Sequence, residues 1–199
     1  MGSAIYFIDS PEHPFDLSKV PANLGCEVVK VPVADWNDAL TPWPAPGLRH
    51  REPFGGHADA TLGALLERVA SDDPRACAIA GYSLGGLFAL YAFTRSDRFD
   101  AAASLSGSLW FDGWNDYLAG AAFPGAGRFA YLSLGTKEKR GMRERLKTVE
   151  DETRRTEALL RAAGVDTEFA LTPGAHFDHV PDRIAAGFVA LANRLVTGA

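Results

Sequence analysis

Residues 81–86 read Gly81-Tyr82-Ser83-Leu84-Gly85-Gly86. An alanine-rich apolar run at 76–80 precedes this hexapeptide, and a second apolar run follows it to residue 94. The pattern is G-x-S-x-G, in which a strand turns sharply into a helix and carries a serine at the tip. Glycines are expected because side chains two residues before and after the serine would clash in so tight a turn. A phosphate-binding loop is the other interpretation, but no lysine follows as in a Walker A loop.

Short apolar, β-branched or aromatic runs alternate along the chain with longer helical patterns. This alternation predicts strand–helix units around a mostly parallel sheet with helices on both faces, an α/β fold. The predicted helices are residues 60–70 with Asp59 as N-cap, 84–94, 143–163, and a last helix from Pro181 to Gly198. The predicted strands are residues 4–8, 27–33, 76–80, 101–105, 129–134 and 168–171.

Length and composition favour one domain over residues 1–199. A chain of 199 residues, 47% of them hydrophobic, can bury a sizeable core but is too short to divide comfortably into two domains. The net charge of −5 arises from residues of mixed sign, which disfavours nucleic acid or an anionic membrane as a partner. The N-terminus lacks the basic segment and long apolar run of a signal peptide, so we expect a cytoplasmic location.

A serine hydroxyl becomes a good nucleophile only when a base takes its proton. In this fold the base is a histidine that follows a late strand. His176 meets this requirement, because it lies between the last predicted strand and the last predicted helix, and His179 is the local alternative. The acid that orients the imidazole should follow the strand at 129–134. Glu138 is the first choice there, with Glu150, Asp151 and Asp178 as alternatives.

The position of Ser83 at a helix N-terminus favours an anionic intermediate. Free N–H groups and the helix dipole stabilise negative charge on an attacked carbonyl, and the N–H of Leu84 should be one oxyanion donor. The second donor should come from the loop that follows the first strand, Asp9-Ser10-Pro11-Glu12. Pro11 has no N–H, which leaves the N–H of Ser10 or of Glu12.

Aromatic residues lie in loops that we expect at the carboxyl ends of the strands, above Ser83. The alternative for any one of them is that it packs a loop-rich cap against the sheet. Arg49 and Arg51 could meet an anionic substrate or simply be solvated. The residues from which we predict an aromatic acyl or alcohol pocket are Trp36, Trp43, Tyr82 and Trp110, with Phe111 and Trp114 nearby.

Several segments together resemble the esterase family that includes the enterochelin esterases and, more distantly, esterase D. The resemblance covers nearly the whole chain. Its segments are Ile5-Tyr6-Phe7-Ile8-Asp9, Leu40-Thr41-Pro42-Trp43, Phe54-Gly55-Gly56, the hexapeptide at 81–86, Ser106-Gly107-Ser108-Leu109-Trp110 and His176-Phe177. One departure is Asp9-Ser10, where the family has Asp-Gly.

This resemblance implies Ser83 and His176 as catalytic residues, Trp110 near the acyl or alcohol pocket, and no metal or organic cofactor. It also implies a minimal α/β-hydrolase fold with six strands, because the chain begins at the segment that resembles the third strand of the full fold. The absence of the first two strands leaves one sheet edge uncovered. A second copy of the chain could cover that edge, so a homodimer is expected.

The leading hypothesis is hydrolysis of a small-molecule carboxylic ester through an acyl-enzyme. Ser83 would attack, His176 would move the proton, and Glu138 would orient the imidazole. A thioesterase or a lactonase would use the same residues. A catalytically silent protein of the same fold that binds a ligand or a partner is the alternative. Contact between Ser83 and His176 would favour the enzyme, and a blocked oxyanion site would favour the binding protein.

Overall fold

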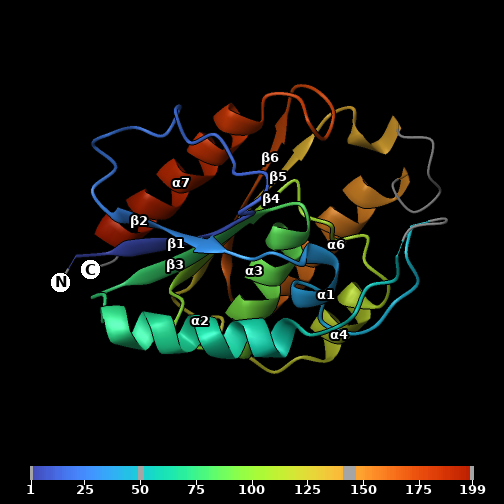
Figure 1. Cartoon of the computed structure of the whole chain (residues 1–199), viewed down its shortest axis with the longest axis horizontal. Coiled ribbons are helices and arrows are strands. Elements are labelled where there is room, and N and C mark those ends of the chain that lie inside the picture. The colour runs from blue at the N-terminus through green and yellow to red at the C-terminus, as the bar shows by residue number, and fades with distance from the viewer. Residues whose placement is uncertain (1, 49–51, 141–146, 198–199) are drawn as a thin grey trace.

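The computed structural model describes residues 2–48, 52–140 and 147–197. Its sheet has six strands in the order β2-β1-β3-β4-β5-β6, and every neighbouring pair is parallel (Figure 1). The predicted α/β fold is confirmed, with a sheet that is wholly rather than mostly parallel. The strands are β1 (Ala4–Asp9), β2 (Glu27–Pro32), β3 (Cys77–Tyr82), β4 (Ala101–Leu105), β5 (Phe129–Gly135) and β6 (Asp166–Thr172).

The predicted helices also form. Residues 143–146 of the third predicted helix lie outside the described residues. Asp59 is not the N-cap of α2, because His57 precedes the helix and Asp59 lies in its first turn, where its carboxylate accepts a hydrogen bond from Tyr91. The helices are α1 (Trp36–Ala39), α2 (Ala58–Asp72), α3 (Leu84–Arg95), α4 (Trp114–Gly120), α6 (Val149–Ala162) and α7 (Val180–Thr197), with a 3-10 turn η1 (Glu138–Arg140).

The four central strands are buried on both faces, because helices cover both. α7 packs on one face, where Phe188 and Leu191 meet alternate strand residues such as Phe7. Apolar residues of the segment 15–24 join α7 on that face. α2, α3, α4 and α6 cover the other face (Figure 1). Both cysteines are free thiols, of which Cys77 is buried and Cys26 is partly exposed.

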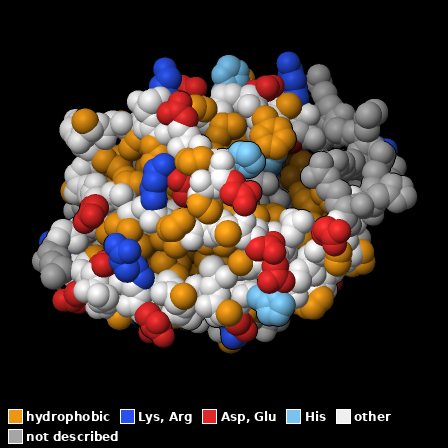
Figure 2. All heavy atoms as spheres, viewed as in Figure 1, with side chains coloured by type: hydrophobic (Ala, Val, Ile, Leu, Met, Phe, Trp, Pro, Cys, Tyr) orange, Lys and Arg blue, Asp and Glu red, His pale blue; other side chains and the backbone are white. Residues whose placement is uncertain are grey.

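The surface offers no large field of a single charge on the face that Figure 2 presents. Acidic and basic side chains are interspersed there, with apolar side chains between them (Figure 2). Among the helices of the described residues, none has both the length and the apolar character needed to cross a bilayer.

Parallel strands place their carboxyl ends along one edge of the sheet. The loops that follow β3, β4, β5 and β6 all begin at this edge. Tyr82 at the end of β3 pairs with Leu105 at the end of β4, and Leu105 pairs with Ser133 of β5. The loops that follow β3, β4, β5 and β6 therefore begin at similar heights above the sheet.

Candidate active site

The turn from β3 to α3 holds Ser83 in a strained conformation. The φ angle of Ser83 is 55°, a value that residues other than glycine rarely adopt. A Cβ atom at Gly81 would lie 2.2 Å from the carbonyl oxygen of Gly85, so glycine is required there. At Gly85 the nearest atoms would be 3.5 Å away, so the clash expected two residues after the serine does not occur.

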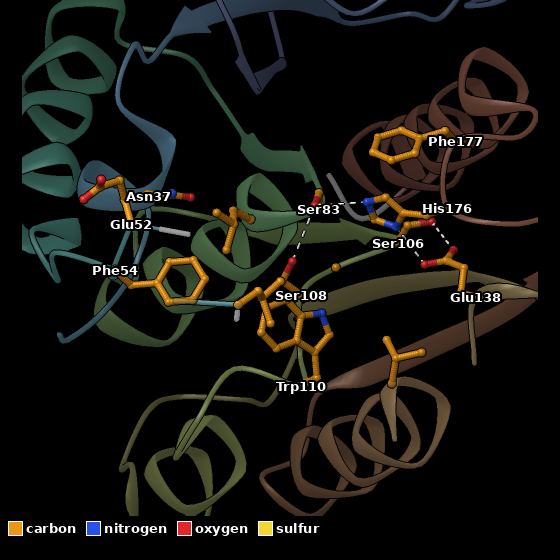
Figure 3. A pocket seen from close by; sticks show the side chains of 14 residues that line it. Asn37, Glu52, Phe54, Ser83, Ser106, Ser108, Trp110, Glu138, His176 and Phe177 are labelled. Carbon is orange, nitrogen blue, oxygen red and sulfur yellow. Dashed lines mark hydrogen bonds and ion pairs between the residues drawn. The ribbon is translucent and has the colours of Figure 1, made fainter. Parts of the chain in front are cut away.

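Ser83, His176 and Glu138 lie in a line above the ends of β3, β6 and β5 (Figure 3). The Ser83 Oγ to His176 Nε2 distance is 3.1 Å, and His176 Nδ1 is 2.8 Å from Glu138 Oε2. When Nδ1–H donates to the carboxylate, Nε2 carries the lone pair that accepts the Ser83 proton. This geometry is that of a nucleophile, a base and an orienting acid.

The Glu138 carboxylate is buried but well supplied with donors. Its Oε1 accepts hydrogen bonds from Ser106 Oγ at 2.8 Å and from the Gly135 N–H at 2.7 Å. Burial alone would raise the pKa of Glu138, but the hydrogen bond and charge of His176, with those two donors, hold that pKa below its usual value. The carboxylate is therefore ionised at neutral pH and can stabilise an imidazolium.

Arg183 of α7 lies beneath this line, and sequence reasoning did not single it out. Its side chain is fully buried and donates to Ser106 Oγ at 2.6 Å, to Glu138 Oε1 at 3.4 Å and to the Tyr82 hydroxyl. The Tyr82 hydroxyl in turn donates to the carbonyl oxygen of His176. One guanidinium thus links the acid to the loop that carries the base. Nothing in the local sequence marks Arg183, because an arginine on an amphipathic helix is usually solvated.

The alternative base and acids lie elsewhere. His179 is exposed, and Asp178 Oδ2 accepts the Ala175 N–H at 2.8 Å within the histidine loop. Asp151 is exposed on α6. Glu150 forms ion pairs with Lys139 at 2.8 Å and Arg154 at 3.0 Å. The structure therefore brings Glu138 and His176, rather than these residues, to Ser83.

A cavity of about 380 Å³ opens in front of Ser83. Figure 3 shows Phe177 and Trp110 on opposite sides of the serine, with Phe54 farther along the wall. Phe177 is 85% exposed and its ring lies edge-on to His176. The lining residues are Asn37, Leu48, Glu52, Phe54, Ser83, Leu84, Ser106, Gly107, Ser108, Trp110, Glu138, Val149, His176 and Phe177.

Only Trp110 of the four predicted pocket aromatics lines this cavity. The indole N–H of Trp36 donates to the Val33 carbonyl oxygen at 2.8 Å, and that of Trp43 donates to the Asp112 carbonyl oxygen at 2.8 Å. Both tryptophans therefore pack the cap, which was the alternative interpretation.

Tyr82 is also misplaced by the prediction, because its ring is buried under the histidine loop and does not reach the cavity. Phe54 and Phe177 line the cavity and were not predicted as pocket residues. Arg49 and Arg51 lie outside the described residues.

Of the residues predicted to bind the oxyanion, Leu84 lies at the cavity, whereas Ser10 and Glu12 do not. Leu84 lines the cavity as the first residue of α3, where a helix leaves its N–H groups free. The Ser10 N–H donates to Asp9 Oδ1 at 3.0 Å, and neither Ser10 nor Glu12 is among the cavity residues. The Asp9 side chain thus occupies the Ser10 amide, and the structure does not bring Ser10 or Glu12 to the cavity.

Comparison with known proteins points to one family. Residues 46–178 match the family described as Putative esterase. The siderophore enterobactin esterase of Emericella nidulans is 37% identical over 92 residues, which are 41% of this chain and 29% of that protein. The chain therefore matches less than a third of the length of this curated relative.

Solved structures share the fold. The siderophore hydrolase EstA from Aspergillus nidulans has a TM-score of 0.70 at 21% identity, covering 100% of this chain and 84% of its own. An IroE-like serine hydrolase from Shewanella oneidensis has a TM-score of 0.70 at 16% identity, covering 96% and 70%. The enterobactin esterase FES from Shigella flexneri has a TM-score of 0.69 at 19% identity, covering 98% and 52%. The match over residues 46–178, which is more than half of the chain, shows that this protein belongs to the family described as Putative esterase.

Proposed function

We propose that this protein is a serine hydrolase that cleaves a carboxylic ester through an acyl-enzyme. The observation that carries the proposal is the unbroken chain of contacts from Ser83 Oγ to His176 at 3.1 Å and from His176 to Glu138 at 2.8 Å. Because Ser83 and His176 are within hydrogen-bond reach, the enzyme is favoured over a catalytically silent binding protein.

The reaction has two halves. Ser83 Oγ attacks the ester carbonyl carbon while His176 Nε2 takes the hydroxyl proton, and Glu138 stabilises the imidazolium. The carbonyl oxygen becomes an oxyanion that the Leu84 N–H binds. The carbon–oxygen bond to the alcohol then breaks, and His176 protonates the leaving alkoxide. In the second half a water molecule gives a proton to His176 while its oxygen attacks the acyl carbon. The bond between that carbon and Ser83 Oγ then breaks, His176 returns the proton to Oγ, and the acid is released.

The walls of the cavity support an ester with an apolar acyl or alcohol group as the substrate. Phe54 and Trp110 form one wall, and Phe177 stands on the other side of the serine (Figure 3). Apolar surface removed from water against such rings stabilises binding. A thioester or a lactone would fit the same chemistry, and the ester is favoured by the family. A cytoplasmic location and a homodimer stay predictions.

The test is turnover of p-nitrophenyl esters of increasing acyl length by wild type and Ser83→Ala. We expect turnover by wild type and a loss of about 10⁴-fold or more in kcat for the variant. Ser96→Ala, at the far end of α3, is the matched control and should keep full activity. A folded wild type that turns over none of the esters, or an equally active Ser83→Ala variant, would contradict the proposal.

A further inference from the structure

The intermediate at Ser83 needs more than one oxyanion donor. Loss of a single donor typically costs about 10²- to 10³-fold in kcat, so a site with only the Leu84 N–H would be slow. In this fold the second donor is usually an amide of the loop after the strand beside the nucleophile strand. That strand is β1 here, because β1 and β4 flank β3.

Three of the four N–H groups in residues 10–15 of the loop after β1 are in use, all but that of Glu12. The N–H groups of Ser10 and Phe15 both donate to Asp9 Oδ1, at 3.0 and 2.9 Å, and the His13 N–H donates to Ser10 Oγ at 3.2 Å. Asp9 is buried and its other oxygen is 2.8 Å from Lys30 Nζ, so its carboxylate is fixed in place. None of residues 10–15 lines the cavity.

Ser108, which follows β4, offers a donor on the other side of the nucleophile. It lines the cavity, its side chain is buried, and its Oγ is 3.4 Å from Ser83 Oγ. Among the described residues this is the one hydrogen-bond partner of the Ser108 hydroxyl. A separation of 3.4 Å is long for a bond between hydroxyls, which normally measures about 2.5–3.0 Å. The hydroxyl is therefore weakly held and can turn to a stronger acceptor.

The backbone holds Ser108 at a fixed place relative to Ser83. The Ser108 N–H donates to the Ser83 carbonyl oxygen at 3.0 Å, and the Ser108 carbonyl oxygen accepts the Phe111 N–H at 3.0 Å. The preceding turn is tightly packed, because a Cβ atom at Gly107 would lie 2.0 Å from Ser104 Oγ. A donor that is already placed needs little reorganisation as charge develops.

The base and the Ser108 hydroxyl approach Ser83 from different directions. In Figure 3 the dashed line from Ser83 to His176 and the line from Ser83 to Ser108 diverge from the serine. Ser83 Oγ–H can therefore point to His176 while Ser108 Oγ–H points to Ser83 Oγ. Ser108 and Leu84 both line the cavity in front of Ser83, where the oxyanion would form.

We propose that the Ser108 hydroxyl is the second oxyanion donor, acting beside the Leu84 N–H. Ser108 Oγ–H turns from Ser83 Oγ to the carbonyl oxygen as that oxygen gains negative charge. The proton stays on Ser108 throughout, so Ser108 stabilises the intermediate by a hydrogen bond and no covalent bond of this residue forms or breaks. This inference rests on the proposed ester hydrolysis and names a further catalytic residue for it.

The test compares wild type with Ser108→Ala on p-nitrophenyl butyrate and with a trifluoromethyl ketone, whose serine adduct carries an oxyanion. We expect kcat to fall about 10²-fold or more while KM changes by less than about threefold. Affinity for the trifluoromethyl ketone should fall by a factor similar to that in kcat, and affinity for the product butyrate should not change. Ser108→Cys, similar in size but a weak donor, should show the same losses and serves if Ser108→Ala does not fold.

Ser104→Ala is the matched control, because Ser104 is a buried serine of β4 whose hydroxyl has no partner among the described residues and does not line the cavity. It should keep wild-type kcat. Wild-type kcat in a folded Ser108 variant would overturn the inference, and so would a loss of kcat with unchanged affinity for the trifluoromethyl ketone. A folded wild type without any turnover would instead refute the proposed function, and the inference with it.

Discussion

Two buried arginines lie at opposite ends of β5, and they are held in different ways. Arg128, just before the strand, donates to the backbone carbonyl oxygens of Phe93, Ser96 and Phe99 at 2.6, 2.9 and 3.0 Å. Its guanidinium also lies 3.7 Å from the centre of the Phe93 ring. Arg183, beyond the other end, donates mainly to side chains, those of Tyr82, Ser106, Thr172 and Glu138.

The difference indicates that the arginine at the amino end of β5 serves folding alone, whereas the one at the carboxyl end also supports the candidate active site. At the amino end Arg128 satisfies carbonyl oxygens that a helix and a loop leave without partners. At the carboxyl end Arg183 holds an acid and, through Tyr82, the backbone of the base. The same residue type should therefore matter for folding at one end and for both folding and catalysis at the other. The following variants test this separation.

Glu138→Gln should have the largest effect on catalysis. Glutamine has nearly the same shape but cannot stabilise an imidazolium, and the amide favours the wrong imidazole tautomer, so kcat should fall about 10⁴-fold. Steady-state kinetics on p-nitrophenyl esters, with circular dichroism to check folding, measure this. Nearly full activity of Glu138→Gln would show that Glu138 is not the acid that orients His176, and that the contacts at the carboxyl end of β5 do not serve catalysis through it.

Arg183→Met should reduce both activity and stability. The long apolar side chain fills the space but leaves Glu138 with one donor fewer, so we expect a loss of about 10²-fold in kcat with little change in KM. The free energy of unfolding should fall by about 3 kcal/mol, because a buried charge loses its partner. Arg183→Lys, which keeps the charge, should recover part of kcat. A loss of stability with wild-type kcat would make Arg183 equivalent to Arg128.

Arg128→Met should show the complementary result. Four backbone carbonyl oxygens, those of Phe93, Ser96, Phe99 and Pro124, lose their donor, and the free energy of unfolding should fall by about 3 kcal/mol in urea titrations. In the folded protein kcat should stay at the wild-type value, because Arg128 does not line the cavity. A loss of kcat without a loss of stability would contradict the claim that Arg128 serves folding alone.

Phe177→Ala should have a small effect that depends on the substrate. The ring is 85% exposed, so its loss should leave the melting temperature unchanged. Partial burial of an apolar substrate group against the ring is worth about 1 kcal/mol, so kcat/KM for long or aromatic esters should fall about fivefold. For p-nitrophenyl acetate kcat/KM should hardly change. An equal loss for all esters would mean that Phe177 positions His176 rather than the substrate.

The pH dependence of stability should carry the smallest signal. The folded-state pKa of Glu138 lies below its unfolded value of about 4.3, so its contribution to stability is complete above that value and is lost as the pH falls through the folded-state pKa. Urea midpoints measured between pH 6 and about pH 3 should therefore fall more steeply for wild type than for Glu138→Gln. Parallel curves for the two proteins would contradict this.

Sequence reasoning found what local patterns and chain order encode. The strand, turn and helix around Ser83 are contiguous, so one motif was enough to single out Ser83 as the candidate nucleophile. His176 and Glu138 follow from their places after late strands, because parallel strands end at a common edge. The alternation of short apolar runs with helical periods likewise predicted all six strands.

What the sequence did not reveal depends on contacts between distant residues. Arg183 meets Ser106 across 77 positions, and no local pattern marks that meeting. Trp36 and Trp43 could have faced the cavity, but their indole N–H groups donate to backbone carbonyl oxygens in the loops after β2 and β4. The Ser10 amide donates to the Asp9 side chain, a contact that residue order along the chain does not predict.

Labelling with a fluorophosphonate probe, followed by intact mass, tests most directly whether Ser83 is an activated nucleophile. Wild type should gain one adduct, Ser83→Ala should gain none, and His176→Ala should react at a small fraction of the wild-type rate, because the probe needs the same base as the ester. No adduct on folded wild type, or an adduct that persists on Ser83→Ala, would contradict the serine hydrolase mechanism.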